Sequence, residues 1–82
     1  MHSNPKAQHI KELIASQIGV EADDINTDDM LSDDLHMSPA DLSDLTESLN
    51  KAGFDINQSD FSTIETVEEL IDHVLEGDIV NG

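Results

Sequence analysis

The sequence of 82 residues has no cysteine, tryptophan or tyrosine, and it has only two phenylalanines. The lack of cysteine excludes a disulfide framework, a thiolate metal site and a cysteine nucleophile. So few aromatic residues, without a glycine-rich phosphate loop, argue against nucleotide binding. The N-terminus lacks the apolar stretch of a signal peptide, and no window approaches the length of a membrane-spanning helix. We therefore expect one small cytoplasmic domain over residues 1–82, with a core over about 5–77 and a flexible tail over 78–82.

Basic residues are also scarce, with three against nineteen acidic residues and a formal net charge of −16. Such a surface would be repelled by nucleic acid and by anionic membranes, so neither is expected as a partner. A basic patch on another protein is the natural complement, and it would mainly speed the encounter. High acidity is also typical of disordered chains, but the apolar residues here are periodic rather than sparse. The pattern favours a folded domain, which we expect to be a monomer.

The first helix is expected to begin at Asn4 and Pro5, as N-cap and first helical residue. Gly19 provides the left-handed stop. Between them, apolar residues recur at helical spacing on one face: Ile10, Leu13, Ile14 and Ile18.

A long segment over residues 20–37 follows and shows no sustained period. Its apolar residues are spaced as if an irregular loop enters the core repeatedly, and a loop of this length in a compact domain is unusual. These apolar residues are Ile25, Met30, Leu31 and Leu35.

The second helix has a clear start, because Ser38, Pro39 and Asp41 form a capping-box-like sequence. Gly53 is expected to end this helix. Its inner stripe consists of Leu42, Leu45 and Leu49.

Two further helical segments are expected before the C-terminus. Ser59 could cap a short third turn that carries Phe61 and Ile64. Thr66 and Glu69 form a second capping box for the last helix, and Gly77 is expected to stop it. No run alternates apolar and polar residues convincingly, so we predict an all-α fold: three main helices, a short third helix and a long loop between the first and second.

In this order the elements resemble the acyl carrier protein family over roughly residues 8 to 77. The similarity is carried by many positions, none diagnostic alone: Ile18-Gly19-Val20, Ile25, Leu31, Asp34-Leu35, Phe54-Asp55-Ile56, Ile64-Glu65-Thr66-Val67, Leu70, Ile71, Asp72 and Val74. The resemblance implies a small four-helix bundle in which a serine at the start of the second helix bears 4′-phosphopantetheine. It also implies that acidic residues of that region dock on basic surfaces of biosynthetic enzymes and of a phosphopantetheinyl transferase. The matching acidic residues are Asp34, Asp41, Asp44 and Glu47, although a merely solvated acidic face would look the same.

The modification motif departs from the family pattern Asp-Leu-Gly-x-Asp-Ser-Leu. The corresponding residues are Asp34-Leu35-His36-Met37-Ser38-Pro39-Ala40. Without gaps the family's serine falls on Pro39, which has no hydroxyl, and its glycine falls on His36. A slip of one residue would place Ser38 at the attachment point, at a helix N-terminus that suits a phosphodiester. Ser38 also suits a plain N-cap that needs no cofactor.

Two functions therefore stay open. In the first, the chain presents an acyl or peptidyl group on phosphopantetheine attached to Ser38. In the second, it keeps the carrier fold and acidity but acts as a protein-interaction adaptor without the prosthetic group. No catalytic or metal site is expected, because the four histidines share no ligand spacing and the paired aspartates do not form a calcium loop. Serine, histidine and aspartate are present, but nothing in the pattern arranges them as a nucleophile with its base.

Overall fold

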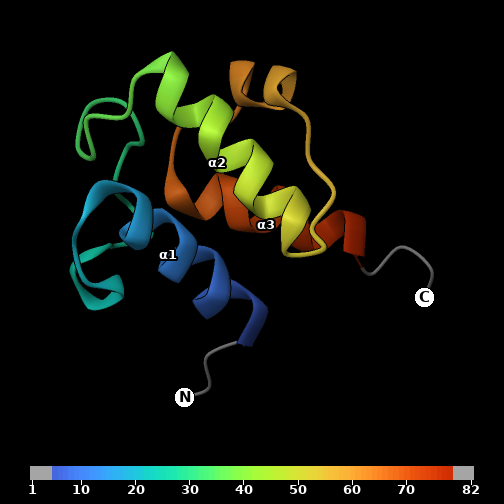
Figure 1. Cartoon of the computed structure of the whole chain (residues 1–82), viewed down its shortest axis with the longest axis horizontal. Coiled ribbons are helices and arrows are strands. Elements are labelled where there is room, and N and C mark those ends of the chain that lie inside the picture. Colours follow the sequence, from blue (N-terminus) through green and yellow to red (C-terminus); the bar gives the residue numbers. More distant parts are fainter. Residues whose placement is uncertain (1–4, 79–82) are drawn as a thin grey trace.

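A computed structural model describes residues 5–78 of the chain (Figure 1). Three α-helices account for most of the described residues, and two short 3-10 helices lie in the connections. No strand occurs in this range, so the predicted all-α class is confirmed. The elements in chain order are α1 (Pro5–Ile18), η1 (Ala22–Asp24), α2 (Pro39–Lys51), η2 (Gln58–Ser62) and α3 (Val67–Asp78).

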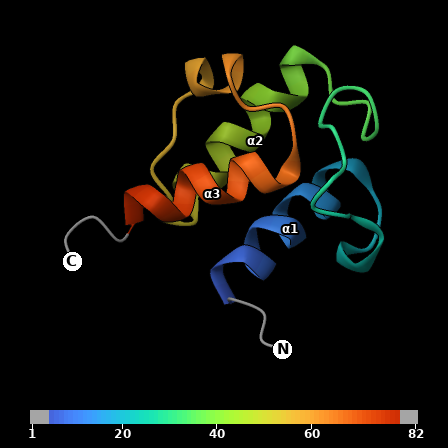
Figure 2. The same cartoon turned by 180° about the vertical axis from the view of Figure 1, so that it is seen from behind.

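The helices are arranged so that one end of the molecule collects the segment between α1 and α2. Figure 1 shows the end of α1, the long loop and the start of α2 together at the left. The start of α1 and the ends of α2 and α3 lie toward the other side, and Figure 2 shows the same grouping from behind. The region that the family resemblance singles out therefore lies at one end of the bundle.

The core is a cluster of fifteen buried apolar side chains from the three helices and from both connections. Ile10, Leu45 and Leu70, one from each main helix, are 0% exposed. The cluster buries no polar or charged side chain among the described residues. The full set is Ile10, Ile14, Ala15, Ile25, Leu31, Met37, Leu45, Leu49, Phe54, Ile56, Ile64, Val67, Leu70, Ile71 and Val74.

The long loop enters this core as predicted, with Ile25 and Leu31 buried and Met30 and Leu35 partly buried. Met37 is also buried, at 3% exposure, although no periodic pattern of apolar residues predicted its burial. Backbone hydrogen bonds tie the loop to the segment before α3. The Leu31 amide donates to the Glu65 carbonyl at 2.8 Å, and the Val67 amide to the Asp29 carbonyl at 3.0 Å.

Most predicted helix ends are confirmed. Gly19 and Gly53 follow α1 and α2 with φ of 80° and 99°, the left-handed conformation that glycine adopts easily. At α3 the Glu69 amide donates to the Thr66 hydroxyl at 3.1 Å, and the Glu69 carboxylate accepts from the Thr66 amide at 3.3 Å. The predicted cap at Asn4 and residues 79–82 of the predicted tail lie outside the described residues, whereas Asp78, the first residue of that predicted tail, is the last residue of α3.

Two predicted boundaries are wrong. The cap of η2 is Asn57 rather than Ser59, because only Asn57 has an acid three residues later: the Asp60 carboxylate accepts from the Asn57 amide at 2.9 Å. Ile64 consequently follows this turn instead of lying in it. At the other boundary, α3 continues through Gly77 to Asp78. A glycine costs a helix interior only about 1 kcal/mol relative to alanine, so it does not end the helix by itself.

Candidate carrier site and docking surface

Ser38 is the N-cap of α2, and its backbone is extended, with φ of −83° and ψ of 170°. Its hydroxyl accepts a hydrogen bond from the Asp41 amide at 3.2 Å. In return the Asp41 carboxylate accepts from the Ser38 amide at 2.9 Å and from the Ser38 hydroxyl at 3.1 Å. This is the capping box that the sequence predicted, and it satisfies amides that a helix start leaves unpaired.

Pro39 is the first residue of α2, directly after the cap. A proline is favourable there because its missing N–H would have had no helical partner and its φ is already helical. The side chain has no hydroxyl, so it cannot form a phosphodiester. Ser38 is exposed and is the one hydroxyl-bearing residue of the sequence 38–42, so any attachment at the start of α2 falls on Ser38.

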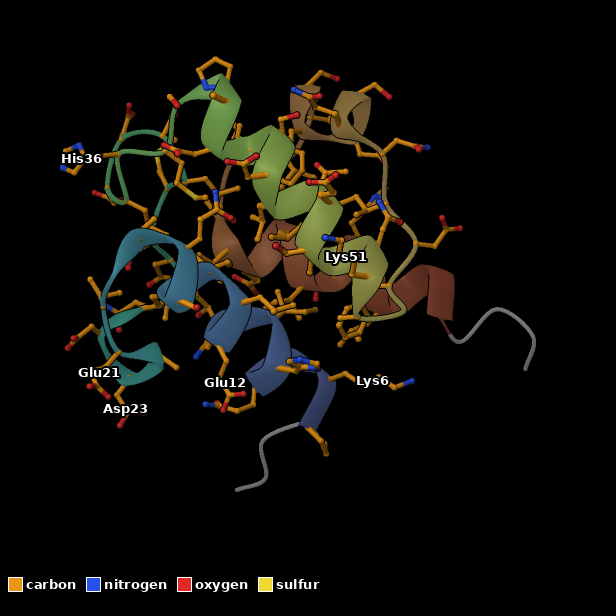
Figure 3. All side chains as sticks on the ribbon, in the orientation of Figure 1. Lys6, Glu12, Glu21, Asp23, His36 and Lys51 are labelled. Atoms are coloured by element: carbon orange, nitrogen blue, oxygen red, sulfur yellow. The ribbon has the colours of Figure 1, made fainter. Side chains whose placement is uncertain are left out.

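His36 occupies the left-handed region with φ of 57°, the one described residue other than glycine with a positive φ. This is the position at which the family pattern has glycine, so the backbone turn is retained although the residue is not. A residue with a Cβ pays about 1–2 kcal/mol for this conformation. Figure 3 shows the imidazole pointing out from the loop, away from the helices.

The four acidic residues predicted to dock partners fall into two groups. Asp34 precedes the helix, where its carboxylate accepts from the Met30 amide at 2.7 Å, and Asp41 belongs to the capping box. Asp44 and Glu47 are exposed farther along α2. The first pair is held in place by backbone donors, whereas nothing in the described part of the chain constrains the second pair.

A pocket of about 480 Å³ lies where the end of α1 meets the start of α2. It unites Asp34 and Asp41 with residues that the sequence reasoning did not select, notably Gln17 and Asp24. Four segments contribute to it, namely the end of α1, η1, the loop before α2 and α2 itself, which is why no local pattern revealed it. The lining residues are Gln17, Ile18, Val20, Asp24, Asp34, Leu35, His36 and Asp41.

A histidine–carboxylate pair lies away from this end, between η2 and α3. His73 Nε2 is 3.2 Å from an Asp60 carboxylate oxygen. The hydrogen bond from the Asn57 amide is the main cause that lowers the pKa of Asp60 below its ordinary value. Desolvation opposes this effect, and the nearby His73 adds to it. This pair closes the η2 turn onto α3 and is not near Ser38 in the sequence or in the contacts described.

Among the side chains that the structure describes, no three from histidines or acidic residues come together as a metal site would require. In the same range no helix is both long and apolar enough to cross a membrane.

Comparison with known families gives a match over most of the chain. Residues 8–74 match the family model described as the phosphopantetheine attachment site. The chain belongs to the acyl carrier protein family. An acyl carrier protein of Rubrobacter xylanophilus is 33% identical over 84% of this chain and 86% of its own length. Those of Solidesulfovibrio magneticus and Chlamydia trachomatis are 32% and 31% identical, over 83% and 82% of this chain and 88% of each relative.

Membership in the acyl carrier protein family confirms the resemblance drawn from the sequence, and the helical fold agrees with it. Acyl carrier proteins hold a group for other enzymes, so membership also supports the prediction that this chain is not itself an enzyme. Phosphopantetheine is the prosthetic group for which the matched family is described. Whether Ser38 suits that group can be judged from its geometry.

Ser38 meets the steric requirement, because its hydroxyl is exposed at a helix N-terminus that favours negative charge. Two features would have to change on esterification. The hydroxyl proton now bonded to Asp41 would be lost, and the Asp41 carboxylate would have to turn away from the added phosphodiester. Both are side-chain rearrangements at an exposed site, so the group fits at Ser38 without a change in the helix.

Proposed function

We propose that this chain is an acyl carrier whose prosthetic group, 4′-phosphopantetheine, is attached to Ser38. The observation that carries the proposal is the exposed Ser38 hydroxyl at the start of α2, in a chain that matches the phosphopantetheine attachment family over residues 8–74. When bound, the group supplies a thiol that holds an acyl or peptidyl chain as a thioester. The protein residues position the attachment point and present it to partner enzymes.

In this role the acidic residues around Ser38 would dock on basic surfaces of biosynthetic enzymes and of the phosphopantetheinyl transferase. Asp34 and Asp41 lie next to the attachment point, and Asp44 and Glu47 extend the same charge along α2. Charge complementarity of this kind raises association rates and orients the encounter. We expect the carrier to work as a monomer in the cytoplasm.

A second function is favoured by one specific observation, the complete capping box between Ser38 and Asp41. The capping box gives the Ser38 hydroxyl a structural role, and Pro39 occupies the position at which the family pattern has its serine. In this alternative the chain keeps the carrier fold and its charge but holds no prosthetic group. It then acts as an acidic adaptor that binds basic proteins.

The intact mass of the protein distinguishes the two functions. The protein is incubated with coenzyme A, magnesium and a broad-specificity phosphopantetheinyl transferase, beside an acyl carrier protein known to be a substrate. A gain of one phosphopantetheine that is absent in Ser38→Ala and retained in Ser43→Ala supports the carrier. No gain while the known substrate is modified supports the adaptor.

A further inference from the structure

We propose that the pocket between the end of α1 and the start of α2 binds the neutral part of the prosthetic group, the pantetheine arm. The inference rests on the proposed attachment to Ser38 and goes beyond it, because it gives the arm a binding site on this chain when no partner enzyme is present. The position of the pocket, its apolar wall and its charge favour this ligand.

The pocket begins next to the attachment point. Asp41, which lines the pocket, also accepts a hydrogen bond from the Ser38 hydroxyl at 3.1 Å. Leu35 and His36 line the pocket from the loop shortly before Ser38. A group attached to the Ser38 oxygen is therefore held close to the pocket, and such a tether gives it a high effective concentration there. Even a weak site would then be occupied.

The pocket has an apolar wall that includes an exposed residue. Ile18 and Leu35 are partly buried, whereas Val20 is 42% exposed and is the one large hydrophobic side chain exposed among those described. The Gly19 and Val20 amides donate to the Ala15 carbonyl at 2.8 and 3.0 Å, so the backbone at Val20 is fixed to the end of α1. Covering the exposed part of Val20 with an apolar group would be favourable. The geminal methyl groups of pantetheine are such a group.

The polar part of the pocket favours a ligand that donates hydrogen bonds and carries no negative charge. It contains the carboxylates of Asp24, Asp34 and Asp41, and neither lysine nor arginine lines the pocket. Carboxylates accept hydrogen bonds and repel anions. Pantetheine is uncharged at neutral pH and donates hydrogen bonds from amide and hydroxyl groups. The pocket therefore suits the arm, while the anionic phosphodiester stays at Ser38 on the helix N-terminus.

The pocket is formed by the chain alone, because the Gln17 side chain joins the two helices that bound it. The Gln17 Nε2 donates to the Asp41 backbone carbonyl at 2.5 Å. The volume of about 480 Å³ lies within the range of about 300–1,000 Å³ that is typical of small-molecule sites. At η2, by contrast, the Ser43 hydroxyl of α2 donates to the Gln58 side chain at 3.2 Å. We therefore place the arm on the α1 side of α2 rather than on the η2 side.

The test uses the full chain, labelled with ¹³C and ¹⁵N and loaded with unlabelled phosphopantetheine by the transferase. Isotope-filtered NOE spectra then detect contacts between the methyl groups of the arm and the protein. We expect NOEs to the methyl groups of Val20 and Leu35, together with shifts of the Ile18 and Val20 amides on loading. NOEs to Phe61 of η2 in place of Val20 and Leu35 would overturn the proposal.

Two variants at position 20 make a matched pair, with Leu35 as the reporter. Val20→Ile keeps the apolar wall and should retain the NOEs between the arm and Leu35. Val20→Asp places a charge beside the methyl groups of the arm and should lose these NOEs. Both proteins should keep the helical spectrum of the parent, because the side chain of Val20 is exposed. Equal NOEs to Leu35 in the two variants would overturn the proposal.

The intact mass separates this inference from the carrier function. A chain that gains the mass of phosphopantetheine but shows no NOEs to Val20 and Leu35 would overturn the inference and leave the carrier function standing. A chain that gains no mass, while a known acyl carrier protein is loaded, would overturn the carrier function and the inference with it.

Discussion

The Asp41 carboxylate bonds to both the amide and the hydroxyl of Ser38, at 2.9 and 3.1 Å, at the start of α2. The residue that the carrier function would modify is therefore also the residue that begins the helix. Ser38 must retain a cap strong enough to order α2 while leaving its hydroxyl exposed. Because Ser38 would serve both roles, the stability of the fold and the carrier function have to be measured separately in its variants.

Ser38→Ala should destabilise the protein by about 1 kcal/mol, because it removes the oxygen that accepts from the Asp41 amide. The measurement is the free energy of unfolding in urea. Ser38→Asp restores an acceptor at the cap and should recover part of the loss, because the nearby Asp41 carboxylate opposes a second negative charge. Ser43→Ala serves as a control, since the Ser43 hydroxyl makes one exposed side-chain hydrogen bond. An unchanged stability in Ser38→Ala would contradict the cap.

His36→Gly should stabilise the fold by roughly 0.5–1 kcal/mol. Glycine removes the strain of about 1–2 kcal/mol that a residue with a Cβ has in the left-handed conformation. Glycine also gives the unfolded chain more conformational freedom, which offsets about 0.4–1 kcal/mol of this gain. Thermal unfolding followed by circular dichroism measures the effect. His36→Ala retains the Cβ and should show no gain. A loss of stability in His36→Gly would mean that the imidazole makes contacts worth more than the backbone relief.

Leu45→Ala should cost about 2–5 kcal/mol, because Leu45 is 0% exposed in the centre of the core. Urea unfolding again gives the free energy. Val20→Ala is the matched truncation at the surface, where Val20 is 42% exposed, and it should change stability by less than about 0.5 kcal/mol. Similar losses in the two variants would place Leu45 outside the core.

Asp60 should make the stability of the protein depend on pH in the acidic range. The Asn57 amide, followed by His73, holds the pKa of Asp60 below its ordinary value of about 3.9. Because the folded pKa is lowered, the stabilisation is complete above the ordinary value and is lost as the pH falls through the lowered pKa. The stability difference between the parent and Asp60→Asn should therefore shrink below about pH 4.

Carboxyl ¹³C NMR titration checks the cause of this shift. In His73→Ala the pKa of Asp60 should rise only part of the way, because the Asn57 amide still donates to the carboxylate. Complete return to the ordinary value in His73→Ala would assign the shift to the histidine instead.

The sequence was sufficient where one local rule determined the structure. The Ser38–Asp41 and Thr66–Glu69 boxes, the glycines after α1 and α2 and the helical stripes each depend on residues a few positions apart. The same rules failed at Ser59, because Asn57 also suits an N-cap and has an acid three residues later. They failed at Gly77 as well, because this glycine lies inside α3 and does not end it. Local signals therefore identify candidate helix ends but do not decide between two neighbouring candidates.

Features built from distant segments were not predictable. Met37 is buried because the irregular loop folds back on Leu31, whose carbonyl accepts from the Met37 amide at 3.0 Å. The pocket brings Gln17 and Asp24 beside Asp34 and Asp41, which no periodicity links. Position 36 could be recognised as a replaced glycine from the sequence, but only the structure shows that the left-handed turn persists there.

The attachment of phosphopantetheine to Ser38 is tested most directly by peptide mapping after treatment with the transferase. Cleavage before aspartate releases residues 34–40, in which Ser38 is the one hydroxyl-bearing residue. We expect the mass of phosphopantetheine on that peptide, without fragmentation being needed to assign the site. The same mass on residues 41–43, which contain Ser43, or no added mass while a known acyl carrier protein is loaded, would contradict attachment at Ser38.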